Sequence, residues 1–305
     1  MVRRLQKRQQ QPSHKEQEPI WQNKKKSELG IALCFILPSL LGVAIFVLVP
    51  FMDVVRRSFF GAMNGKFIGL KNYNTIFNND AFKLASGNTI KFILVCIPLL
   101  VILSLLLAVL VNSIKYKSEV FKTTFLLPMA IPVASVVLLW RVIFHQNGLL
   151  SKLVIELGGQ SVDWMKTDWA FWILVASYIW RNIGYDMVLW LAGLSNIPPE
   201  IYEAAEVDGA GVWQRFAKIT VPNLMPTLFM IVVLSLLNSF KVFREAYLIA
   251  GDYPHNSMYM LQHLFNNWFA SLDIDKLSAA AVVVAAVILV LILLLQKTWG
   301  SEEES

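Results

Sequence analysis

Long apolar runs without charges alternate with shorter polar segments along this chain. Each run is close to the roughly 20 residues that a helix needs to cross a bilayer. The pattern therefore predicts membrane-spanning helices. Five runs satisfy this criterion directly, at 30–52, 92–111, 123–140, 222–240 and 277–295.

A sixth stretch, 169–194, is apolar at both ends but carries Arg181, Asn182 and Asp186 in its middle. Ionisable groups at that depth need a partner or water, and we count this stretch as a sixth span. The fold class predicted is an all-α polytopic membrane protein with about six transmembrane helices.

The composition agrees with a membrane protein. Hydrophobic residues make up 56% of the 305 positions and charged residues 16%, a balance that excludes an ordinary soluble domain. The net charge of +6 could indicate nucleic-acid binding. Basic side chains beside anionic lipid explain that charge more simply, and we expect no nucleic-acid partner.

The distribution of Lys and Arg predicts the orientation. These residues are more frequent in 1–29, 114–122, 196–222 and 297–305 than in the intervening loops. The positive-inside rule then predicts that both termini are cytoplasmic. We expect a disordered basic tail over 1–29, a transmembrane domain over 30–299 and a short cytoplasmic tail over 300–305. The basic tail is too long for a cleavable signal peptide.

A short polar hairpin, 196–222, separates two apolar segments. Pro199 suits the first turn of a helix, Ala204 and Ala205 leave one side without bulk, and Gly209 permits a left-handed residue at the end. This pattern predicts the first arm of a cytoplasmic helix-turn-helix.

The second arm shows an apolar stripe. Val212, Phe216 and Ile219 recur at i, i+4 and i+7, and Pro222 is expected to start the next segment. The hairpin is net acidic, opposite to the charge that favours a cytoplasmic loop, so an ordinary solvated loop explains it poorly. Its charged residues are Glu200, Glu203, Glu206 and Asp208 against Arg215 and Lys218.

The spacing of the hairpin resembles the EAA motif of ABC importer permeases. The matching residues are Glu203-Ala204-Ala205, Gly209 and Ile219-Thr220-Val221-Pro222, with Val221 where the family usually has Leu. The volume and apolarity of Val are close to those of Leu.

The resemblance extends over about residues 28–299. The segments 197–202, 208–210, 214–216 and 278–280 are similar to carbohydrate-importer permeases related to the maltose, glycerol-3-phosphate and multiple-sugar systems. Gly251-Asp252-Tyr253-Pro254 departs from the Thr-x-Gly-Gly-Pro of many members.

The resemblance implies that 30–299 is the permease domain of a binding-protein-dependent type I importer in a bacterial-type plasma (inner) membrane. Such an importer works by alternating access. The partners implied are a second homologous permease, giving a heterodimer, two ATPase subunits, an extracytoplasmic solute-binding protein and a carbohydrate substrate. In this family the hairpin is the coupling helix that docks into the ATPase. The residues carried over to that role are Glu203, Ala204, Ala205, Asp208, Gly209, Ile219 and Pro222.

We expect Trp180, Asn182, Tyr185 and Asn238 to line the substrate path, because aromatic faces beside hydrogen-bonding groups suit a sugar. The alternative is internal neutralisation. Arg181 would then pair with Asp186, and Arg244 with Glu245 would lie at the outer interface.

No catalytic or metal-binding pattern accompanies these features. The four histidines lack ligand-like spacing, Cys34 and Cys96 lie in predicted spans, and the sequence contains no P-loop. We therefore expect no cofactor and no enzyme activity, with ATP hydrolysed by a partner chain. The remaining alternatives are an importer of polyamine, phosphate or amino acid, or a secondary carrier with Arg181, Asp186 and Lys241 as an ion relay.

Overall fold

The computed structural model describes residues 35–62, 65–114 and 118–300. The chain divides into two units, residues 1–56 and 57–305. The predicted basic tail over 1–29, the beginning of the first predicted span and residues 301–305 lie outside the described residues.

The described part of the first unit is one helical stretch that starts at Phe35 and continues into α2 (Val49–Ser58). It contains the π-helical turn η1 (Ala44–Leu48), in which the N–H of Val49 bonds to the carbonyl of Ala44. Pro50 follows directly and has no N–H to donate to the preceding turn. A π turn before a proline absorbs that missing bond without ending the helix.

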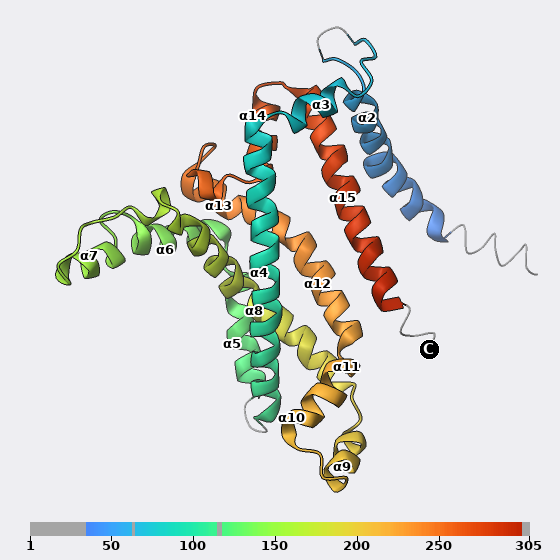
Figure 1. The fold of residues 1–305 in the computed structure, drawn as a ribbon, viewed down its shortest axis with the longest axis vertical. Coiled ribbons are helices and arrows are strands. Elements are labelled where there is room, and N and C mark those ends of the chain that lie inside the picture. The colour runs from blue at the N-terminus through green and yellow to red at the C-terminus, as the bar shows by residue number, and fades with distance from the viewer. Residues whose placement is uncertain (1–34, 63–64, 115–117, 301–305) are drawn as a thin grey trace, which may run out of the picture. The chain divides into compact units, whose positions relative to one another are not determined.

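The second unit is organised around α4 (Asp80–Ser113) and α8 (Trp169–Ser195), which pack along each other (Figure 1). Asn79 caps α4, its side-chain oxygen accepting the N–H of Phe82 at 3.0 Å. The helix therefore begins well before the apolar run at 92–111. A Cβ on Gly184 would collide with the backbone of Phe125, so glycine permits the close approach of α8 to α5 (Ser118–Ala130).

Shorter elements connect and surround this pair. They are α3 (Lys71–Phe77), α6 (Val133–Phe144), α7 (Leu149–Glu156), η2 (Trp164–Lys166), α9 (Pro199–Val207), α10 (Val212–Arg215), η3 (Phe216–Thr220), α11 (Val221–Asn223), α12 (Met225–Ser239), η4 (Phe240–Val242), α13 (Phe243–Ala250), η5 (Asn256–Met258), α14 (Leu261–Ala270) and α15 (Ile274–Gly300).

The apolar run at 123–140 is not the single helix that hydropathy predicts. It is divided into α5 and α6 at Ile131 and Pro132, where Pro132 is extended with φ −56° and ψ 138°. A residue before proline disfavours the helical conformation, which explains why α5 ends there.

Five helical stretches among the described residues are long and apolar enough to cross a membrane, at Phe35–Ser58, Asp80–Ser113, Val133–Glu156, Met225–Leu248 and Ile274–Lys297. Helix α8 is not in this set. It is 27 residues long, and many of its side chains are buried among its neighbours. That α8 spans the membrane as a sixth helix stays a prediction.

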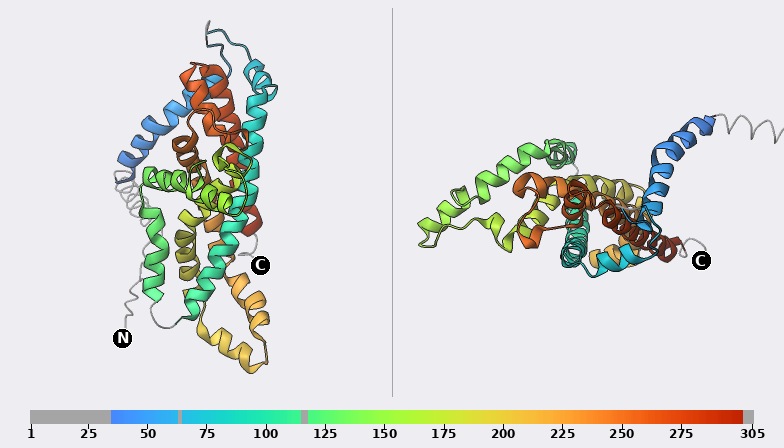
Figure 2. Two further views of the ribbon diagram at one scale, coloured as in Figure 1. Left: turned by 90° about the vertical axis from the view of Figure 1, so that its left-hand side faces the viewer. Right: turned by 90° about the horizontal axis from the view of Figure 1, so that it is seen from above.

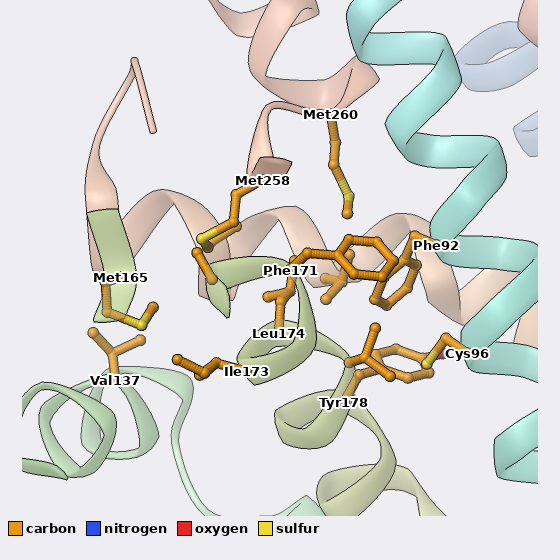
Figure 3. Packing of buried hydrophobic residues seen from close by; sticks show 14 of the residues in the cluster. Phe92, Cys96, Val137, Met165, Phe171, Ile173, Leu174, Tyr178, Met258 and Met260 are labelled. Atoms are coloured by element: carbon orange, nitrogen blue, oxygen red, sulfur yellow. The ribbon is translucent and has the colours of Figure 1, made fainter. Parts of the chain in front are cut away.

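Among the described residues, three buried clusters hold the second unit together. One joins α4 and α8 to α6 and α13, with Phe92 edge-on to Phe171 and Tyr178 at its centre (Figure 3). A second joins α3, α14 and α15 to the beginning of α4. The third joins α4, α8 and α12, where Trp190 Nε1 donates to Ser104 Oγ at 3.0 Å.

Candidate functional site

The first arm of the hairpin is α9, which begins at Pro199 and ends in a Schellman cap. The N–H of Ala210 bonds to the carbonyl of Ala205 at 2.9 Å, and the N–H of Gly209 bonds to that of Glu206 at 3.0 Å. Gly209 has φ +80°, a conformation that side chains with a Cβ resist. The left-handed turn predicted at Gly209 is confirmed.

The second arm is a continuous helical stretch formed by α10, η3 and α11. The side chain of Gln214 accepts the N–H of Gly211 at 3.1 Å and so caps its start. The π turn η3 again ends two residues before a proline, Pro222. Pro222 therefore lies inside the helical stretch that leads to α12, rather than at the start of a separate segment.

Side-chain bonds close the hairpin. The hydroxyls of Tyr202 and Thr220 lie 2.9 Å apart, and Arg215 pairs with Glu206 at 2.7 Å. A cavity of about 460 Å³ remains between the arms, lined by Ala205, Asp208, Gly209, Ala210, Gln214, Arg215, Lys218 and Ile219. The hairpin extends beyond the end of α4 (Figure 2).

The surface of the hairpin is partly apolar. Val207 is 88% exposed, Val212 76% and Trp213 77%, and the Trp213 ring stacks on Phe216 with centroids 5.6 Å apart. Glu203, Ala204, Asp208 and Pro222 are exposed beside them, while Ala205 and Ile219 are half-buried.

Exposed apolar groups on a polar element are typical of a contact surface. Sequence analysis did not single out Val207 and Trp213. The sequence did contain a signal for them, because both are large apolar residues in a hairpin that carries several carboxylates.

The residues predicted to line the path do not form one cluster. Trp180 packs edge-on against Trp140 of α6, with centroids 5.8 Å apart. Asn182 donates to the carbonyl of Tyr178 in its own helix at 2.8 Å. At 3.6 residues per turn, Trp180 and Asn182 lie about 200° apart around α8. Tyr185, three residues after Asn182, lies on nearly the same face of α8 as Asn182.

Asn238 is on α12, one turn beyond Ser235, and is half-buried. Ser235 joins α12 to α8 twice. Its hydroxyl donates to Asp186 at 3.0 Å, and its carbonyl accepts the Tyr178 hydroxyl at 3.3 Å. Asn238 thus lies one turn from the place where Ser235 of α12 bonds to α8.

The partner considered for Arg181 and the place considered for Glu245 are wrong. Arg181 pairs with Glu245 of α13 at 2.9 Å rather than with Asp186, and Glu245 is only 5% exposed rather than at an interface. Ser177 donates to the same carboxylate at 3.2 Å and accepts from Trp140 Nε1 at 2.7 Å. Arg181 also donates to the carbonyl of Ile131, at the break between α5 and α6.

Comparison with known proteins shows that this chain matches one protein family and is similar to permeases. Residues 88–297 match the family described as a binding-protein-dependent transport system inner membrane component. The lactose transport system permease protein of Rhizobium radiobacter is 31% identical over 220 residues, 70% of this chain and 74% of the relative. The arabinooligosaccharides transport system permease protein of Bacillus subtilis (strain 168) is 30% identical over 236 residues, 75% of each chain.

Among solved structures, a chain of a bacterial ABC transporter involved in the import of the acidic polysaccharide alginate has a TM-score of 0.78 and 25% identity. The match covers 92% of this chain and 98% of that one. The family match covers more than half of the sequence and contains both the hairpin and α8. The chain therefore belongs to the family of binding-protein-dependent transport system inner membrane components, and it is a multi-pass membrane permease subunit.

Proposed function

We propose that this chain is the permease subunit of an ATP-driven importer that moves a sugar or oligosaccharide by alternating access. The hairpin carries the proposal, because it is internally bonded yet presents Val207, Trp213 and Glu203 to a partner. The carbohydrate is supported by related permeases, whose names specify lactose and arabinooligosaccharides, and by the structural neighbour, which serves alginate import.

The hairpin is connected to the helices of the second unit so that its movement is passed on to them. Its second arm continues through α11 into α12 with a single non-helical residue, Leu224, between them. Helix α12 is bonded to α8 through Ser235. A partner that tilts the hairpin would therefore move α12 and α8 together as rigid elements. No chemical step on the solute is required.

The complete importer contains further chains. We propose a second homologous permease, two ATPase subunits that hydrolyse ATP, and an extracytoplasmic binding protein that delivers the sugar. The hairpin and both termini are then cytoplasmic. The proposed ATPase contact comprises Glu203, Ala204, Ala205, Asp208, Gly209, Ile219 and Pro222. We add Val207 and Trp213 to it because both are exposed on the same hairpin.

The solute path is proposed to include Asn182 and Tyr185 on α8 and Asn238 on α12, with Trp180 on the α6 side of α8. Arg181 and Asp186 have protein partners and serve to position the helices.

Copurification and uptake test this function. The tagged chain is expected to carry ATPase subunits through purification, and proteoliposomes of the complex should take up sugar only with internal ATP and external binding protein. Sugar uptake by the chain without ATPase subunits, driven by an ion gradient, would instead establish a secondary carrier.

A further inference from the structure

A second cavity, separate from the hairpin, has a volume of about 640 Å³. Three segments distant in the sequence form it: the end of α6, the region of η2, and the stretch between α13 and η5. Its lining residues are Arg141, His145, Asp163, Met165, Lys166, Gly251, Tyr253, Pro254 and His255. Cavities of about 300–1,000 Å³ are typical of small-molecule sites.

The charges of this lining favour an anion. Arg141 and Lys166 carry permanent positive charge, and His145 and His255 add ring nitrogens. Asp163 supplies the one carboxylate in the lining and pairs with Lys166 at 3.4 Å. With both histidines neutral, the described lining has one more cation than anions, and Asp168 lies outside the lining, 4.0 Å from His255 Nδ1. A ligand carboxylate or sulfonate there gains charge-assisted hydrogen bonds.

An aromatic ring accompanies these cations. Tyr253 is 79% exposed, and its loop is held by Gly251 at φ +76° and by Pro254. An exposed ring offers a flat apolar face, and donors beside it can bond hydroxyl groups. An inorganic anion would use neither the ring nor the volume, whereas a sugar with an acidic group uses both.

Hydrogen bonds between helices fix part of the cavity wall. Arg141 Nη2 donates to the carbonyl of Leu248 at 2.9 Å and so joins α6 to α13. The neighbouring Trp140 donates to Ser177, which is bonded to Glu245 of α13. These bonds hold two of the three segments before any ligand arrives, which lowers the ordering cost of binding.

We propose that this cavity receives a carbohydrate carrying a carboxylate or sulfonate group, with Lys166 and Arg141 binding the acid and Tyr253 facing a sugar ring. The inference rests on the proposed function, because it specifies the class of sugar that the importer carries. In the proposed orientation the cavity opens on the extracytoplasmic side, where the binding protein releases its sugar.

The test uses the assembled importer without its binding protein and two radiolabelled probes, trigalacturonate and the neutral maltotriose, in equilibrium dialysis. Trigalacturonate is expected to bind more tightly than maltotriose, and Lys166→Gln should weaken its binding about tenfold, as for the loss of one charge-assisted bond. Asp163→Asn should strengthen binding, because it removes the competing carboxylate. A variant that merely damaged the fold would not do so.

The matched control is Lys152→Gln, which removes an exposed lysine of α7 outside the cavity and should leave both affinities unchanged. Equal affinity for the two probes, or equal losses in Lys152→Gln and Lys166→Gln, would overturn the inference. So would a Lys166→Gln variant that keeps trigalacturonate affinity but needs more binding protein for half-maximal ATPase stimulation, since the cavity would then dock the partner. ATP-dependent uptake measured in the same preparations shows separately whether the proposed function holds.

Discussion

The Arg181–Glu245 pair shows how single buried side chains position the helices of this permease. The two side chains are 17% and 6% exposed, and they join α8 to α13. The sequence indicated that Arg181 needs a partner but could not identify it. The helix offered Asp186 five residues away, whereas the true partner is brought near only when α13 folds against α8.

Arg181→Ala is expected to strand a buried carboxylate and to lower the free energy of unfolding by about 3–5 kcal/mol. The amount of folded, membrane-inserted protein and its thermal unfolding in detergent would measure the loss. Arg181→Met combined with Glu245→Leu should recover much of it, because no buried charge is left alone. A double variant no more stable than Arg181→Ala would show that the charges themselves are not the cause.

Among the turns and helices, the hairpin was the part best predicted from the sequence. Pro199, Ala204, Ala205 and Gly209 specify a short helix with a left-handed end, and the structure has both. The π turns before Pro50 and Pro222 were not predicted, because hydropathy reports which face is apolar and not how a missing N–H is absorbed.

Gly209→Val tests the shape of the hairpin. A β-branched residue at φ +80° is expected to cost about 1–3 kcal/mol and to disorder the Schellman cap, so copurification of the ATPase should fall. Ala204→Ser, at an exposed helical position within the proposed contact, is the comparison and should assemble normally, because Ser adds little volume and the backbone there is helical. If both variants retain equal amounts of ATPase, the left-handed turn is not needed for docking.

Helix α14 should be sensitive to acid. Burial lowers the pKa of His263 from 6.5 to about 4, although Asp252 acts in the opposite direction. Because the folded pKa lies below the unfolded one, the stability is complete above about pH 6.5 and is lost as the pH falls toward 4. The full loss is about 3 kcal/mol.

Hydrogen exchange of the segment 259–270 at pH 7.5 and pH 5, corrected for intrinsic rates, measures this effect. The segment should open more readily at pH 5 in the wild-type protein. His263→Gln keeps an acceptor for the Met260 N–H, which His263 Nδ1 accepts at 3.2 Å, and should remove the difference. An undiminished pH effect in His263→Gln would assign it to another group.

For the chain as a whole, composition and apolar runs were sufficient to predict an all-α membrane protein. They were not sufficient to divide the 123–140 run, because Pro132 acts on local backbone geometry rather than on hydropathy. They also could not place the path residues. Helical spacing separates Trp180 from Asn182 around α8, but the fold alone shows that α6 packs against Trp180. Composition and apolar runs also do not indicate which surface of the hairpin is exposed, and the structure shows Trp213 there.

The central claim, that the hairpin couples ATP hydrolysis to transport, is tested most directly by sugar uptake per assembled complex in proteoliposomes loaded with ATP. The comparison is between wild type, Glu203→Ala and Trp213→Ala. Removing either contact should lower uptake and binding-protein-stimulated ATPase activity together, at a cost of roughly 2–5 kcal/mol for a desolvated charge. Membrane insertion should be unchanged. Wild-type uptake and stimulation in both variants would contradict the account.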